Sequence, residues 1–526
     1  MEFSMANFIK YDYKQDVMLV INFEEQLQPG TFEYAIHYLI DNKLDLSVFH
    51  PKFKNKHTGR PAYDPAILLK IILFAYSKGI TSSREIEWCC KTNIIFKALT
   101  CDSVPHFTTI AEFVSSRSKE IEILFEQILL VCDEQGLLGN ELFAIDGCKQ
   151  SSNAAKEWSG TFKELEEKRA KIKRQIKYHL EEQKRLDKNN SCDEERIKRA
   201  TQAIETLNKA SDKIERFLKS SKPRIGESKQ KTEVKSNITD NESAKMMTSK
   251  GTIQGYNGIA TVDKKHQIII DAQAFGSGQE KHTLKPIIEK VNERYKRLNM
   301  SDDIYASNVI VTADTGFANE ENMKYLHENN INAYIPENQF RSRDPKFADQ
   351  KKKYGKRHQN NKKAIIKLFT PEEFNFDPIN KTCRCPMGKS MLLREEKINK
   401  LGHYKLHFGG NLNDCRACEQ VENCMKNPKA LNKEISKPRR VSFIIKKAKR
   451  KPNHTDWMKE RVDSKEGKLY YSHRMSVVEP VFGNIGTNKG LNRFSLRGKE
   501  KVNGQWKLFC LIQNIEKLKN YGELAA

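Results

Sequence analysis

Three carboxylates, separated by more than three hundred residues from first to last, stand where they could bind metal ions. Asp146 follows the apolar run Leu142–Ile145, and Asp314 follows the largely apolar run Val309–Ala313. Both runs predict buried strands that end in an Asp followed by a turn. Glu479 lies in a segment that predicts the start of a helix, with the Glu facing inward. Two strand-end Asp residues and a helical Glu can hold two divalent metal ions, magnesium or manganese, which suits the cleavage and joining of phosphodiester bonds.

The net charge indicates a polyanionic partner. The chain of 526 residues has 92 Lys and Arg against 68 Asp and Glu, a formal net charge of +24. This balance favours DNA or RNA, because phosphate contacts release counterions. The alternative is a Lys- and Asn-rich composition without such a partner. No apolar run reaches the roughly 18–20 residues that span a bilayer, and residues 1–15 lack a signal-peptide core. We therefore expect a soluble, cytoplasmic, nucleoid-associated protein that does not enter a membrane.

The pattern of apolar residues along the chain predicts an α/β protein with several domains. The regions are an N-terminal helical DNA-binding or dimerisation domain (1–135), a catalytic core (136–159 and 236–345, completed by 456–526 with the Glu helix), an inserted charged helical hairpin and linker (160–235), and a Cys-rich insertion with a basic linker (346–455). A purely structural helical bundle is an equal alternative for the first region. The core elements follow in the order of a ribonuclease-H-like mixed sheet.

The inserted hairpin is predicted from two heptad-like segments. Apolar residues recur from Phe162 to Leu186 and, more regularly, from Ile197 to Leu218, and the polar turn 187–193 separates them. Dense charge on the outer faces has two interpretations, a solvated surface or an arm that contacts DNA or a second copy. Residues 221–250 read as a basic, polar linker.

Five of the twelve Cys residues lie close together in the sequence, which predicts a zinc-ribbon-like module. Two close-spaced Cys pairs across a loop suit tetrahedral thiolate ligation of zinc, which would let a small insertion fold. Four positions are needed, so one Cys is left over. We favour Cys385, Cys415, Cys418 and Cys424, with Cys383 as the alternate ligand. Five unligated thiols in a polar segment are the other possibility.

A basic and partly aromatic stretch near the third carboxylate could hold phosphates. The alternative is an exposed basic loop before a last helix. The candidate DNA-binding residues are Tyr471, Arg474, Lys489, Arg493, Arg497 and Lys499.

Taken together, these motifs resemble a DDE transposase of a bacterial insertion sequence, in the subgroup with a Tyr-x-x-Arg…Glu signature. The resemblance covers nearly the whole chain. It is carried by the helical stretch Phe32–Ser115, by Ile145-Asp146-Gly147 with Asn153-Ala154, by Thr239-Asp240 with Gly255-Tyr256-Asn257, by Ala313-Asp314-Thr315-Gly316-Phe317, and by Val478-Glu479-Pro480-Val481-Phe482-Gly483 with Arg493-Phe494 and Arg497-Gly498. The sequence departs from the family pattern at Gly486, where a Lys is common, and Lys489 is the nearby substitute.

The resemblance implies an enzyme that binds the terminal inverted repeats of its element, nicks the ends and joins them to target DNA. Asp146, Asp314 and Glu479 would hold the two metal ions, and Tyr471 and Arg474 would position the scissile strand. A homodimer is expected in the active complex, because two ends must be brought together. Two alternatives stay open: an inactive or repurposed DNA-binding protein, and a nuclease of the same fold that cuts without joining.

Overall fold

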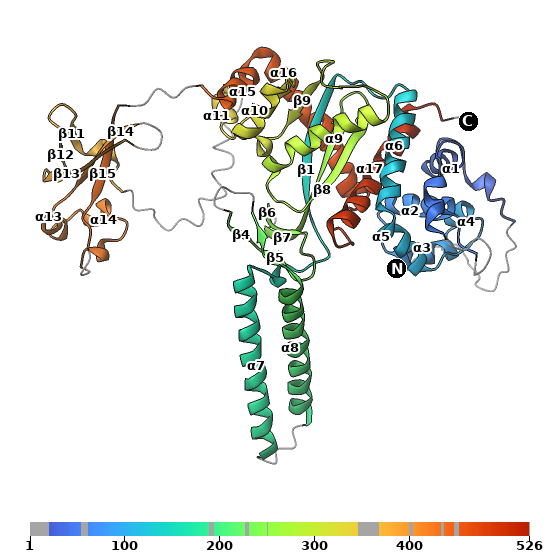
Figure 1. Cartoon of the computed structure of the whole chain (residues 1–526), viewed down its shortest axis with the longest axis horizontal. Helices are drawn as coiled ribbons and strands as arrows, with labels where there is room; N and C mark the ends of the chain where they lie inside the picture. The colour runs from blue at the N-terminus through green and yellow to red at the C-terminus, as the bar shows by residue number, and fades with distance from the viewer. Residues whose placement is uncertain are drawn as a thin grey trace, which may run out of the picture. The chain divides into compact units, whose positions relative to one another are not determined.

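The computed structural model describes residues 20–53, 61–188, 194–226, 231–249, 251–345, 368–398, 403–432, 436–446 and 452–524 (Figure 1). The described residues fall into two compact units, Met1–Asn338 with Met458–Ala526, and Gln339–Trp457. The first unit is mixed α/β with a helical N-terminal region, as predicted. The second is a small antiparallel sheet with short helices.

A six-stranded mixed sheet is the centre of the first unit. Strands β10, β9 and β1 are parallel, β7 is antiparallel to β1, and both β6 and β8 pair with β7. The first residues of β1 are buried, which is why the sequence there is continuously apolar. The bounds are β1 Leu142–Ser151, β6 Ala244–Thr248, β7 Gly251–Asp263, β8 Ile269–Phe275, β9 Ile310–Ala313 and β10 Ala333–Tyr334.

Helices cover both faces of this sheet (Figure 1). Helix α9 (Leu284–Arg297) lies on one face, where the ring of Tyr295 is 6.1 Å from that of Phe143. Helices α16 (Lys465–Gly483) and α17 (Lys499–Tyr521) lie on the other. A Cβ at Gly258 would stand 3.1 Å from the Trp506 ring, so glycine at this position lets α17 lie close to the strand.

The N-terminal region is a group of helices that packs on α17. The ring of Tyr76 lies 5.2 Å from that of Phe509, and both are buried. Helix α2 begins with Asp64 as its cap, which accepts from Ala66 N, and with Pro65 in the first turn. The helices are α1 Phe32–Asn42, α2 Pro65–Ser77, α3 Ser83–Thr92, α4 Ile94–Thr100, α5 Phe107–Ser116 and α6 Ser118–Glu134.

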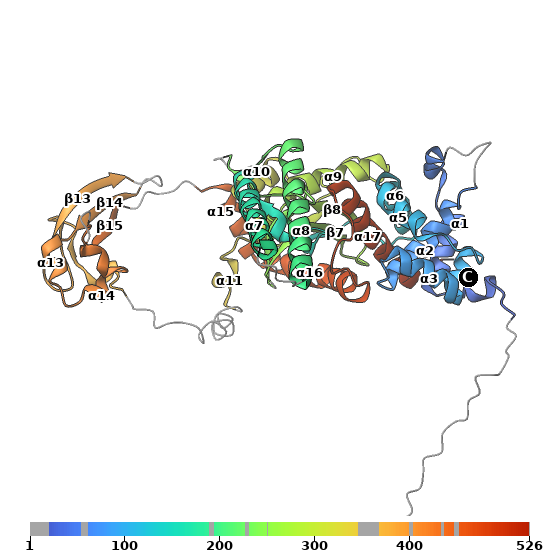
Figure 2. The ribbon, with the colours of Figure 1, turned by 90° about the horizontal axis from the view of Figure 1, so that it is seen from below.

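The inserted hairpin forms as predicted. Helices α7 (Phe162–Lys188) and α8 (Glu194–Ser220) lie side by side in both views (Figure 1, Figure 2), and Figure 1 shows them leaving the sheet as one arm. Leu165, Ile172 and Ile214 form the buried core of its base. Most of the predicted turn lies outside the described residues.

The prediction of a linker over residues 221–250 is wrong for its described part. Short strands occur there, and one of them, β6, joins the edge of the main sheet. These strands are short and polar, so they have no hydrophobic pattern that would predict them. They form through hydrogen bonds to neighbouring strands. The others are β3 Arg224–Ile225, β4 Glu233–Val234 and β5 Ser236–Asn237.

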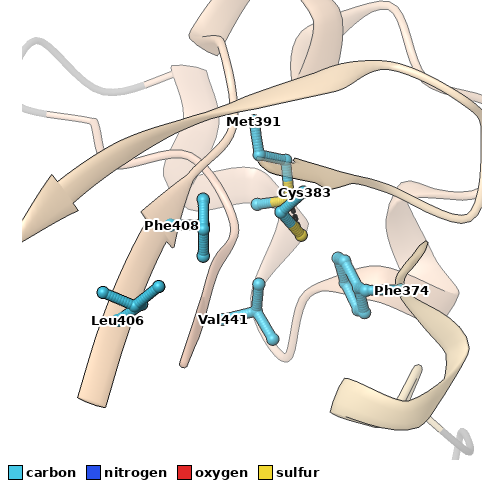
Figure 3. Close-up of a cluster of buried hydrophobic side chains, with 6 residues drawn as sticks. All are labelled: Phe374, Cys383, Met391, Leu406, Phe408 and Val441. Carbon is cyan, nitrogen blue, oxygen red and sulfur yellow. Dashed lines mark hydrogen bonds between the residues drawn. The ribbon is translucent and has the colours of Figure 1, made fainter. Parts of the chain in front are cut away.

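The second unit is built on a five-stranded sheet in the order β11, β12, β13, β14, β15. Its buried core is small (Figure 3) and consists of Phe374, Cys383, Met391, Leu406, Phe408 and Val441. The elements are β11 Asn375–Asp377, β12 Thr382–Arg384, β13 Ser390–Ile398, β14 Tyr404–Gly409, α13 Leu412–Arg416, α14 Val421–Cys424 and β15 Arg440–Lys446. The start of the predicted insertion, residues 346–367, lies outside the described residues.

Candidate active site

Two of the three predicted carboxylates lie side by side, one on strand β1 and one directly after the parallel strand β9. The register pairs Ile145 with Ala313, which places Asp146 beside Asp314. Asp314 follows the end of β9, as predicted, and accepts a hydrogen bond from Thr315 N at 2.7 Å. The predicted strand end at Asp146 is wrong, because β1 continues to Ser151. The longer strand is stabilised by pairing with β7 along its whole second half.

Arg474 joins these two carboxylates. One guanidinium nitrogen donates to Asp146 at 2.8 Å, and another lies 3.6 Å from Asp314. The side chain comes from α16, is buried, and also forms a hydrogen bond with Tyr471. A buried guanidinium with a fixed fork of donors can hold two acidic groups at once. Sequence reasoning selected Tyr471, Arg474 and both Asp residues, and the structure brings these four together.

The electrostatics of this group are those of a crowded acidic site. Burial raises the pKa of Asp146, Arg474 lowers it, and Asp314 raises it again, so that the pKa lies above its ordinary value. For Arg474, burial lowers the pKa, but Asp146, Tyr471 and Asp314 produce a net rise. The guanidinium therefore stays charged and offsets part of the repulsion between the two carboxylates.

Glu280 is an acidic neighbour that sequence reasoning missed. Burial raises its pKa, and the charges of Asp146 and Asp314 raise it further. It accepts from Asn257 Nδ2 at 3.3 Å, and Lys149 lies 3.6 Å from it. No signal in the sequence marks Glu280, since it belongs to a short 3-10 turn with no periodicity.

Glu479 occupies a different position from the one predicted. Helix α16 begins at Lys465, so Glu479 lies near its C-terminal end, not at its start, and the side chain is exposed rather than inward. None of the described hydrogen bonds or ion pairs joins it to Asp146 or Asp314. Its role as a metal ligand remains a prediction.

Pro480, the next residue, has no N–H for the carbonyl of Ser476, which lies four residues earlier. Gln267 Nε2 donates to that carbonyl at 2.9 Å instead. The helix therefore continues through the proline to Gly483.

The predicted basic residues divide into exposed and buried. Arg493 and Arg497 are exposed and both bond to Asn153, which follows the end of β1, at 2.8 and 2.7 Å. Lys499 is also exposed. Lys489 is fully buried and pairs with Glu516 at 2.5 Å, so contact with DNA would require this ion pair to break.

In the second unit, four of the five clustered Cys residues line one small cavity of about 50 Å³: Cys385, Cys415, Cys418 and Cys424. Burial raises the pKa of Cys415, and the neighbouring Cys418 and Cys385 add to the rise. Cys383 points elsewhere. Its sulfur lies 3.9 Å from that of Met391 in the hydrophobic core (Figure 3).

Within the described ranges, no group of three or more His, Cys, Asp or Glu side chains is arranged closely enough to hold a metal ion as it stands. To bind a metal ion, the two Asp side chains, and likewise the four thiols, would therefore have to move closer together. No helix in the described part of the chain is long and apolar enough to cross a membrane.

Comparison with protein families gives two matches. Residues 384–519 match a transposase DDE domain, and residues 21–116 match a transposase domain (DUF772). Neither a curated protein nor a solved structure matches the chain. The first match includes Arg474 and Glu479, and the second covers helices α1 to α5. The two matches, in one chain and in this order, support a DDE-type transposase of an insertion sequence.

Proposed function

We propose that this protein is a DNA transposase that binds the terminal inverted repeats of its own element and catalyses metal-dependent cleavage and strand transfer. The family implies DNA as the partner. The observation that carries the proposal is the pair Asp146 and Asp314, side by side on parallel strands and bridged by Arg474. A structural bundle or simple DNA-binding protein has no need of two neighbouring carboxylates at such a place.

The sheet supports a ribonuclease-H-like core for this enzyme. Its strands lie in the order β8, β7, β1, β9, β10, and β7 is the one strand of these five that runs against its partners. Numbered along the chain, these five strands are the third, second, first, fourth and fifth, and the inserted arm lies in the sequence between β1 and β7. In this order Asp146 lies on the central strand and Asp314 directly after its parallel neighbour.

The residues present fit divalent metal ions. Carboxylate oxygens are the ligands that magnesium and manganese prefer, and Asp146 and Asp314 supply them from two rigid strands. Glu479 would complete the set from α16. When bound, the metal ions would supply Lewis acidity and an activated water or hydroxyl. Arg474 would orient the scissile phosphate, because its fork of donors matches phosphate as well as carboxylate, and Tyr471 would support it.

We also propose that the second unit holds a structural zinc ion through Cys385, Cys415, Cys418 and Cys424. The shared cavity supports this set, and the position of Cys383 in the core argues against the alternate ligand. Zinc would draw the four thiols together as thiolates and stabilise a unit with few buried residues. Its test is the zinc content of the purified protein. We expect one zinc per chain, lost in Cys415→Ser and kept in Cys383→Ala.

The exposed cations Arg493, Arg497 and Lys499 are the proposed DNA contacts of the core. Arg493 donates to the Asn153 side chain and Arg497 to the Asn153 carbonyl, which ties this basic stretch to the end of β1, the strand that carries Asp146. We expect two chains in the active complex, one for each end of the element, and a location at the nucleoid.

The test is a strand-transfer assay with a labelled duplex that carries the ends of the element, taken from the flanks of its gene, and a target plasmid. With magnesium we expect nicks at the end boundary and joined products, and EDTA should prevent both. Nicks without joining would identify a nuclease of the same fold. Binding without cutting under magnesium or manganese would identify an inactive DNA-binding protein.

A further inference from the structure

One helix of the arm carries a concentration of positive charge that the proposed active site does not use. Residues 168–180 of α7 contain six Lys or Arg and no Asp or Glu. The neighbouring helix α8 has seven Lys or Arg and five Asp or Glu, so its charge is nearly balanced. The excess is therefore local to one part of one helix and is not a property of the arm as a whole.

Two of these six cations have structural roles at the base of the arm. Arg169 pairs with Glu215 of α8, and Lys168 lies over the Trp158 ring at 4.3 Å. Lys213 of α8 lies over the same ring at 5.5 Å and donates to Thr239 at 3.1 Å. These contacts join the arm to the sheet unit and fix the direction in which the next turns of α7 point.

The next cations point to solvent. Lys171, Arg174 and Lys177 are exposed and recur every third residue on the side of α7 away from the buried Ile172. Among the described residues, Lys171 and Arg174 have no ion pair, and Lys177 has only a distant contact of 3.9 Å with Glu181. Tyr178, beside them, is 62% exposed. A basic stripe in which two of three cations have no ion pair, next to an exposed aromatic ring, suits contact with phosphates.

The dimensions also suit DNA. Six residues of helix span about 9 Å. Over that length a duplex presents about five phosphate charges. Lys and Arg side chains are long and flexible enough to reach phosphates from an exposed helix face without reading bases. A second protein chain would have to offer an acidic or an apolar surface to this stripe. With three cations and one aromatic ring, the stripe has little apolar surface for such a contact.

We propose that the face of α7 that carries Lys171, Arg174, Lys177 and Tyr178 binds the phosphate backbone of duplex DNA, at a site separate from the carboxylates. The inference rests on the proposed function, since it assumes that the protein acts on DNA. Contacts of this kind are independent of base sequence. The arm would therefore add affinity to element ends and to unrelated duplexes alike.

The test is the salt dependence of binding to a labelled duplex with the element's ends, and to an unrelated duplex, for Lys171→Gln/Arg174→Gln. Each lost phosphate contact lowers the steepness of log K against log salt by about 0.9, so the double variant should lose about 1.8. We expect binding at low salt to weaken by about 10-fold or more for both duplexes. The matched control is Lys209→Gln/Arg216→Gln, which removes the same charge from exposed positions of α8.

An unchanged slope in the α7 variant, while the wild-type protein binds DNA, would overturn the inference and leave the proposed function intact. An equal fall in the α8 control would also overturn it, because net charge would then explain the effect. A change in oligomeric state without a change in slope would assign the face to a second copy. If the wild-type protein binds neither duplex, the proposed function itself fails.

Discussion

The Asp pair in the mixed sheet and the Cys group in the second unit differ in what holds them in place. Asp146 and Asp314 stand on strands in a large core, and Arg474 already offsets their charge. The four thiols stand on turns and short helices around a core of six buried residues. The first site can therefore exist without metal, whereas the second unit has little else to stabilise it.

If both proposed metal sites are occupied, this difference separates two uses of metal in one chain. Where a rigid sheet positions the ligands, a metal ion can come and go, as a reaction at DNA requires. Where the ligands themselves join distant turns, the free energy of metal binding is part of the free energy of folding. The predictions below test that contrast.

Removal of zinc should have the largest effect and should be confined to the second unit. Metal binding in small zinc modules is worth about 10–16 kcal/mol. With a strong chelator, or in Cys415→Ser, we expect β14 to lose amide hydrogen-exchange protection while β1 keeps it. Retained protection of β14 without metal would show that the small core suffices and would break the contrast.

Loss of either Asp should abolish chemistry without unfolding the sheet. Asp146→Ala and Asp314→Ala each remove a proposed direct ligand. Even the mutation of a residue that only hydrogen-bonds to a metal ligand lowers metal affinity or activity by about 10–100-fold. We expect cleavage of element ends to fall more than about 100-fold and end binding to stay close to wild type. Glu479→Ala should act likewise. Normal cleavage by Glu479→Ala would leave the exposed Glu without a role and would direct attention to Glu280.

Arg474→Gln should make the stability of the sheet unit depend on metal. Without the guanidinium, two neighbouring carboxylates lose their buried partner, which costs about 1–3 kcal/mol. Added magnesium or manganese should restore part of the lost stability, because it binds only the folded state. Thermal melting with and without metal measures this. Equal metal responses in the variant and the wild type would show that Arg474 does not offset the charge of the pair.

The smallest effect concerns the helix end that carries Glu479. Gln267→Leu removes the donor to the Ser476 carbonyl beside Pro480, at a cost of about 1 kcal/mol. We expect a small decrease in the free energy of unfolding, measured with urea, and some loss of cleavage because Glu479 is less well placed. Gln273→Leu is a comparison variant, since the Gln273 amide donates to Asp271 on its own strand, β8.

Local patterns predicted much of this arrangement, because they depend on neighbours in sequence. The apolar runs before Asp146 and Asp314 and the heptads of the arm are both local. The pairing of Lys489 with Glu516 and the approach of Glu280 depend on contacts between distant segments, which no spacing reveals.

The Cys residues also show that sequence spacing does not reveal a three-dimensional contact, even between residues that are close in the sequence. Cys383 and Cys385 are two residues apart, and spacing alone leaves both as candidate ligands. The pairing of Cys383 with Met391 across two strands turns its side chain into the core, while Cys385 follows the strand in a turn at the cavity. Only the register of β12 against β13 separates them.

The most direct test of the central claim is manganese binding, followed by electron paramagnetic resonance, in the wild-type protein, Asp146→Ala, Asp314→Ala and Cys415→Ser. The account predicts bound manganese in the wild type and in Cys415→Ser, and its loss in both Asp variants. Equal manganese binding in the Asp variants and the wild type would contradict the assignment of the active site.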